Sequence, residues 1–115
     1  MALAKKKLGK YESGNVFLST ITQAELYFGV EKSKFKSTNL HTLNAFLSFF
    51  PILDFDEKSA IEYAKIRTNL EQSGKIIGAM DMLIASIAIS NDLTLVTNNT
   101  KEFERVPNLR LENWV

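Results

Sequence analysis

Hydrophobic and polar residues follow two different periods along this chain, one typical of strands and the other of helices. Short runs rich in apolar and β-branched residues predict strands at residues 16–19, 52–55, 93–97 and 109–111. Apolar residues at helical spacing predict intervening helices over about residues 22–33, 40–50, 56–73 and 79–91. Strands that alternate with helices favour an α/β domain with a mainly parallel sheet and helices on both faces.

The composition fits one compact globular domain over residues 1–115, because 45% of the residues are hydrophobic and 23% are charged. The chain has no cysteine, which excludes disulfide scaffolds, thiol catalysis and cysteine-based metal sites. A single histidine, His41, excludes a multi-histidine metal site. The formal net charge of +1 is far from the strongly basic balance of an obligate nucleic-acid binder.

The apolar runs are too short for a membrane span. The longest one, Met82–Ile89, falls well below the ~20 residues that a transmembrane helix needs. The lysine-rich segment Met1–Lys10 is not followed by the apolar stretch of a secretory signal. We therefore expect a soluble, cytoplasmic protein with no membrane association.

Three places along the chain carry candidate chemistry. Ligands of open parallel sheets bind outside the carboxyl ends of the strands. The first predicted strand runs into the helix of Glu25, and the strand 93–97 ends at Thr97, two residues before Asn99. Asp81 is the third candidate, because an acid in the first turn of an otherwise apolar helix carries a desolvation cost that needs compensation.

Each candidate also has a simpler structural interpretation. Thr22 and Glu25 have capping-box spacing, so Glu25 could complete the N-terminal cap of its helix. Asp81 could cap the apolar helix, since acids near helix N-termini are favoured by the helix dipole. Thr97 and Asn99 are ordinary loop and turn residue types. Each of these four residues alone fits a structural role, and only their occurrence together favours a functional site.

The combination of residue types fits a hard divalent ion. Mg²⁺ takes oxygen ligands, keeps several waters, and is commonly held by one or two carboxylates. Such a site needs neither histidine nor cysteine. Two carboxylates from different helices, with an amide and a hydroxyl from a strand end, could orient a metal-bound water toward a phosphodiester.

Successive segments of the chain resemble the motifs of PIN-domain VapC-type toxins. These segments are LSTITQAELYFGVEKS at 18–33, IGAMDMLIA at 77–85, LVTNNTKEF at 95–103, RVP at 105–107 and LRLENW at 109–114. The resemblance covers about residues 12–115. It implies a three-layer α/β/α PIN fold and an Mg²⁺- or Mn²⁺-dependent endoribonuclease that cleaves RNA. It also implies a homodimer and inhibition by a small VapB-type antitoxin.

The resemblance assigns roles to the candidate residues. Glu25 matches the family's second acid and Asp81 its third, and both would bind the metal ion. Asn99 falls where the family has a fourth Asp or Asn, and Thr97 supplies a hydroxyl two residues earlier. Together these four residues would form the catalytic site.

The start of the chain departs from the family pattern. Family members begin with a strand that ends in a Leu-Asp-Thr-like motif, and its Asp is the first metal ligand. Met1–Leu8 is instead lysine-rich and helix-prone, and no Asp precedes Asp54. We therefore expect a PIN-like domain that is N-terminally incomplete and lacks its first, central strand. The alternative function is a catalytically inactive remnant that acts only through antitoxin binding or dimerisation.

Overall fold

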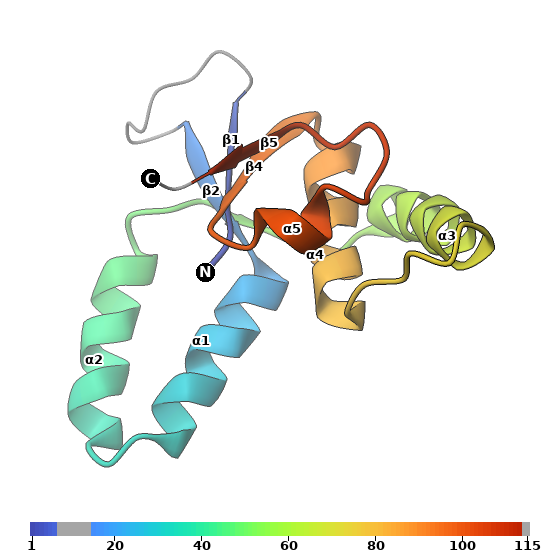
Figure 1. Cartoon of the computed structure of the whole chain (residues 1–115). Helices are drawn as coiled ribbons and strands as arrows, with labels where there is room; N and C mark the ends of the chain where they lie inside the picture. The colour runs from blue at the N-terminus through green and yellow to red at the C-terminus, as the bar shows by residue number, and fades with distance from the viewer. Residues whose placement is uncertain (7–14, 114–115) are drawn as a thin grey trace.

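The computed structural model describes residues 1–6 and 15–113 (Figure 1). Its helices and strands, in chain order, are β1 (Leu3–Lys6), β2 (Val16–Ser19), α1 (Thr20–Lys32), α2 (Lys36–Leu47), β3 (Ile52–Leu53), α3 (Glu57–Gln72), α4 (Ala79–Ser90), β4 (Leu93–Thr97), α5 (Thr100–Phe103) and β5 (Leu111–Asn113). Among the helices of these described ranges, none is both long and apolar enough to cross a membrane.

The five strands form one mixed sheet in the order β3-β2-β1-β4-β5. The two outer pairs, β2 with β3 and β4 with β5, are parallel. The central strand β1 runs antiparallel to both of its neighbours, with Ala4 opposite Phe17 on β2 and Leu95 on β4. The prediction of a mainly parallel sheet is therefore not confirmed.

The central position of the sheet is filled by the segment that we expected to be helix-prone. That expectation was wrong for Leu3–Lys6, and the expected vacancy in the middle of the sheet is not confirmed. Without this segment, β2 and β4 would each expose a row of unpaired backbone groups inside the protein. Pairing these groups outweighs the helix propensity of a Leu-, Ala- and Lys-rich sequence. Ala2, Leu3 and Ala4 are all buried in this position.

Helices cover both faces of the sheet and give a three-layer α/β/α arrangement. One buried cluster packs α3 and α4 against the sheet, and its members include Ala2, Ile66, Leu70, Met82, Ile84, Ala85, Ala88, Leu95 and Phe103. The other cluster consists of Leu3, Val16, Leu18, Leu47 and Val96, with partly buried residues of α1 and α2 packed against it. Side chains of β1 and β4 alternate between the two clusters, as expected for strands buried on both faces.

Most predicted elements are present, with shifted ends. The helix α4 is buried along most of its length, as its apolar sequence predicted. The helix α2 lies several residues earlier than predicted, and β3 and β5 differ from the predicted ranges 52–55 and 109–111. The short helix α5 was not predicted. Trp114, which belongs to the closing motif, lies outside the described residues.

Leu18 offers a direct test of the core, because it lies on β2 with 0% of its surface exposed. We expect Leu18→Ala to lower the free energy of unfolding by about 3 kcal/mol through lost burial and the cavity left behind. The control Leu40→Ala removes the same atoms from a side chain that is 42% exposed, and should cost less than about 0.5 kcal/mol. Urea denaturation measures both values, and equal losses would contradict the packing described above.

Candidate active site

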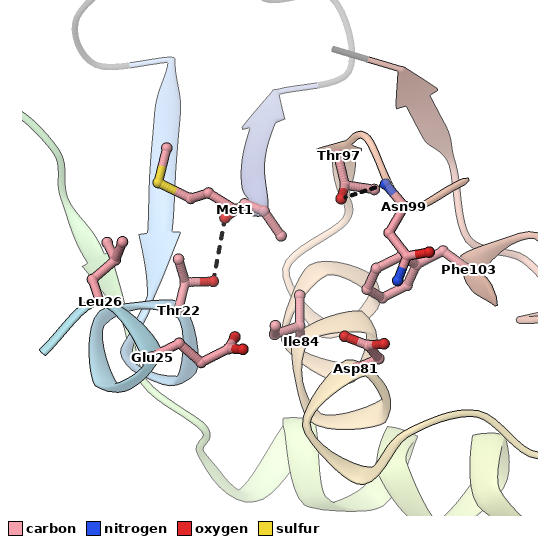
Figure 2. Close-up of a pocket in the computed structure, with 10 residues that line it drawn as sticks. Met1, Thr22, Glu25, Leu26, Asp81, Ile84, Thr97, Asn99 and Phe103 are labelled. Carbon is pink, nitrogen blue, oxygen red and sulfur yellow. Dashed lines mark hydrogen bonds between the residues drawn. The ribbon is translucent and has the colours of Figure 1, made fainter. Parts of the chain in front are cut away.

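A pocket of about 300 Å³ lies where the carboxyl ends of β2 and β4 meet the first turns of α1, α4 and α5 (Figure 2). Its lining residues are Met1, Ala2, Thr22, Glu25, Leu26, Asp81, Ile84, Thr97, Asn99 and Phe103. The four residues singled out from the sequence, Glu25, Asp81, Thr97 and Asn99, all belong to this lining. The structure therefore brings together residues that are up to 74 positions apart along the chain.

Glu25 is not part of the helix cap that its spacing suggested. The N-cap of α1 is Ser19, whose side-chain oxygen accepts a hydrogen bond from the backbone N–H of Thr22 at 3.0 Å. The Thr22 hydroxyl donates instead to the backbone carbonyl of Ala2, the residue before the central strand, at 3.2 Å. The capping-box interpretation of Thr22 and Glu25 was therefore wrong, because the helix begins earlier. Figure 2 shows the exposed Glu25 carboxylate extending from α1 toward Asp81 and Ile84 of α4.

Asp81 lies in the first turn of α4, with its carboxyl group in the pocket. Burial raises the pKa of this carboxyl group to about 7, with further contributions from a hydrogen bond to Glu102 and from the negative charges of Glu102 and Glu25. The same hydrogen bond lowers the pKa of Glu102. Below about pH 7 the protonated carboxyl group of Asp81 therefore donates a hydrogen bond to the Glu102 carboxylate. This pocket concentrates negative charge.

Glu102 was missed by the sequence analysis, although it lies inside the quoted segment 95–103. It lies on α5, which begins directly after Asn99. The side-chain amide of Asn99 donates to Glu102 Oε2 at 3.2 Å, and the backbone N–H of Asn99 donates to Thr97 Oγ1 at 3.1 Å. Thr97 and Asn99 thus build the turn that holds Glu102 beside Asp81. The available signal was the spacing of three residues between Asn99 and Glu102, which places both at the start of one helix.

The donor atoms of the pocket suit a hard cation chemically. Among the lining residues, Glu25 and Asp81 offer carboxylate oxygens, and Thr97 and Asn99 offer a hydroxyl and an amide oxygen. Glu102 adds a carboxylate beside Asp81. Over residues 1–6 and 15–113, no three acidic or histidine side chains form a preassembled metal cluster. The donor set therefore fits an ion held by one or two carboxylates and several waters, which is the usual manner of Mg²⁺ binding.

The central strand brings no carboxylate to this pocket. Because β1 runs antiparallel to its neighbours, its N-terminal end lies at the carboxyl ends of β2 and β4. Met1 and Ala2 consequently line the pocket, and Ala2 contributes a backbone carbonyl that is engaged by Thr22. The acids that line the pocket, Glu25 and Asp81, come from α1 and α4.

Comparison with known proteins identifies the family. The PIN domain family matches residues 2–109. The sequence is 52% identical over 103 residues to "Ribonuclease VapC2" of Rickettsia felis, an alignment that covers 90% of this chain and 77% of the relative. It is 42% identical over 101 residues to "tRNA(fMet)-specific endonuclease VapC" of Shigella flexneri, covering 88% of this chain and 76% of the relative.

Solved structures lead to the same family. The structure of VapBC2 from Rickettsia felis bound to a promoter DNA fragment matches with a TM-score of 0.83 at 55% identity, over 86% of this chain and 74% of that one. VapBC-1 from nontypeable Haemophilus influenzae matches with a TM-score of 0.83 at 28% identity, over 94% of this chain and 79% of that one. The resemblance drawn from the sequence motifs is thus confirmed, and the chain belongs to the PIN domain family and, within it, to the VapC group.

Proposed function

We propose that this protein is a toxin of the VapC type, an endoribonuclease that cleaves RNA with the help of Mg²⁺ or Mn²⁺. The observation that carries the proposal is that Glu25 and Asp81 line one pocket and that burial beside Glu102 raises the pKa of Asp81 to about 7. Crowded carboxylates of this kind are found at sites that bind cations. The named activities of its relatives, a ribonuclease and a tRNA-specific endonuclease, support RNA as the substrate.

Four polar residues of the pocket lining, together with Glu102, have distinct roles in the proposed mechanism. Glu25 and Asp81 would hold the metal ion through their carboxylate oxygens. When bound, the ion polarises the scissile phosphate and lowers the pKa of the attacking water. Asn99 keeps Glu102 in place through its 3.2 Å hydrogen bond, and Thr97 fixes the backbone of Asn99. Glu102 accepts a hydrogen bond from the Asp81 carboxyl group and so orients it in the pocket.

Removal of the divalent ion tests this function. We expect RNA cleavage in Mg²⁺ or Mn²⁺ to fall at least about 100-fold in excess EDTA, because the remaining donors cannot replace the charge of the ion. Addition of Mn²⁺ beyond the chelator should restore the rate. The assay follows fragments of a labelled RNA on a denaturing gel. Cleavage that continues unchanged in EDTA would contradict a metal-dependent mechanism.

A VapB-type antitoxin is the proposed protein partner, and a homodimer the proposed assembly. The solved structures that match this chain include VapBC assemblies from three bacteria. The second candidate function, an inactive remnant that only binds antitoxin or its own copy, is favoured by one observation: β1 supplies no carboxylate to the pocket. Calorimetric titration with the VapB of Rickettsia felis VapBC2 separates the two. Binding without any RNA cleavage in Mn²⁺ supports the remnant, and absence of binding contradicts it.

A further inference from the structure

A second, open groove of about 540 Å³ is lined by Gly74, Lys75, Lys101, Glu104 and Arg105. One wall is the connection between α3 and α4, and the other is α5 with the turn that follows it. Arg105 joins the two walls, because its Nη1 donates to the backbone carbonyl of Ile76 at 3.1 Å. Three cationic side chains and one acidic side chain therefore face the same open space.

The two lysines of this groove are available to a ligand. Lys75 and Lys101 are exposed, and among the described residues neither takes part in an ion pair or a cation–π contact. By contrast, Lys36 and Lys65 pair with Glu31 and Glu62. With three cations against the single carboxylate of Glu104, the lining of the groove carries a net positive charge.

The groove adjoins the acidic pocket through α5. Lys101 and Glu102 are neighbours on this helix, and Phe103 lines the pocket. This helix therefore supplies one residue to each cavity, Lys101 to the groove and Phe103 to the pocket. The groove and the pocket lie on two sides of the same short helix.

We propose that Lys75, Lys101 and Arg105 bind the backbone phosphates of the RNA strand whose scissile phosphate enters the acidic pocket. This inference rests on the proposed function of that pocket. An acidic pocket repels a polyanion, and a net charge of +1 provides little long-range attraction. Cations placed beside the pocket supply the missing affinity. Among the residues that line the groove there is no aromatic side chain on which a base could stack, so its contribution is independent of sequence.

The test measures binding of a labelled single-stranded RNA in EDTA over a series of salt concentrations. Each neutralised phosphate of a single strand contributes about −0.7 to the slope of log K against log salt. The variant Lys75→Gln/Lys101→Gln should therefore reduce the steepness of this slope by about 1.4 and weaken binding at low salt at least about tenfold. The matched control Lys34→Gln/Lys65→Gln removes the same charge from the tip of the α1–α2 hairpin and from α3, and should leave the slope unchanged.

Further readouts separate phosphate binding from a structural role. Lys75→Arg/Lys101→Arg keeps the charges and should keep the slope. In Mg²⁺, the Gln variant should raise KM for RNA and leave kcat unchanged, because the reacting groups are untouched. An unchanged slope in the Gln variant, or an equal loss in the control, overturns the proposal. So does a loss of VapB binding with normal RNA binding, which would assign the groove to the protein partner.

Failure of this proposal and failure of the proposed function give different results. Binding in EDTA does not depend on cleavage. Suppose that Lys75→Gln/Lys101→Gln reduces the salt dependence of RNA binding, but the wild-type chain cleaves no RNA in Mg²⁺ or Mn²⁺. The groove proposal then stands and the nuclease proposal falls. If the chain cleaves RNA and the slope is unaffected by the variant, the reverse holds.

Discussion

Replacement of Asp81 by asparagine is expected to lower the rate of RNA cleavage at least about 100-fold while raising the stability of the metal-free protein at pH 8 by about 1 kcal/mol. The loss of rate follows from removal of a charged oxygen ligand from the proposed metal site. The gain in stability follows from removal of an acid that is half-buried beside Glu102 and Glu25. An amide of the same shape keeps a hydrogen-bond donor for Glu102 and carries no charge.

The sign of the pH dependence follows from the raised pKa. Between pH 3.8 and about 7, the unfolded chain has released the proton of Asp81 and the folded chain still holds it. The folded protein binds more protons in this interval, so its stability falls as the pH rises from about 4 to about 7. The lowered pKa of Glu102 acts in the opposite direction, and solvent reaches part of the Asp81 side chain. We therefore expect about 1 kcal/mol rather than the full value of the shift.

The measurement combines cleavage assays with urea denaturation in EDTA at pH 5 and pH 8. In the unsubstituted protein, ionisation of Asp81 should lower the free energy of unfolding between pH 5 and pH 8. Asp81→Asn should remove most of this decrease. The control Asp54→Asn changes an exposed carboxylate that does not line the pocket, and should leave cleavage unchanged. A variant that loses cleavage together with several kcal/mol of stability would instead mark Asp81 as a structural residue.

The sequence singles out four residues that line one pocket, because they lie near the ends of strongly patterned elements. Asp81 begins the most apolar helix of the chain, and Thr97 ends a fully buried strand. The interpretation of Glu25 as a cap failed because Ser19, six residues earlier, is the actual N-cap. Glu102 could not be found from periodicity, since α5 is only four residues long. Its hydrogen bond to Asp81 joins α5 to α4, and local sequence does not encode such a tertiary contact.

The central strand illustrates a different limit of sequence analysis. Leu3–Lys6 has a helix-prone composition, and its conformation is decided by pairing with β2 and β4. Lys5 is tolerated in the middle of a sheet because its ammonium group reaches Glu112 Oε2 at 2.6 Å with only 12% of its side chain exposed. Strand direction is a property of pairing and not of composition. For this reason the antiparallel arrangement of β1 was not foreseen.

A designed disulfide tests this direction of β1. Lys5 lies opposite Thr94 in the antiparallel register, at a separation that suits a disulfide. In Lys5→Cys/Thr94→Cys the two thiols are the only ones in the protein, because the natural chain has no cysteine. Oxidation should crosslink them nearly completely. Closing a loop of roughly 90 residues should stabilise the oxidised form by about 4 kcal/mol relative to the reduced form of the same variant.

The matched pair Leu3→Cys/Thr94→Cys makes the result decisive. If β1 ran parallel to β4 with Ala4 still opposite Leu95, Leu3 and not Lys5 would lie opposite Thr94. In the observed register Leu3 lies opposite Val96, two residues away from Thr94, so this pair should crosslink poorly. Mobility on non-reducing gels and thermal unfolding with and without reductant measure both pairs. Preferential crosslinking of Leu3→Cys/Thr94→Cys would show that β1 runs parallel to β4. Met1 and Ala2 would then lie at the opposite end of the sheet from Glu25 and Asp81.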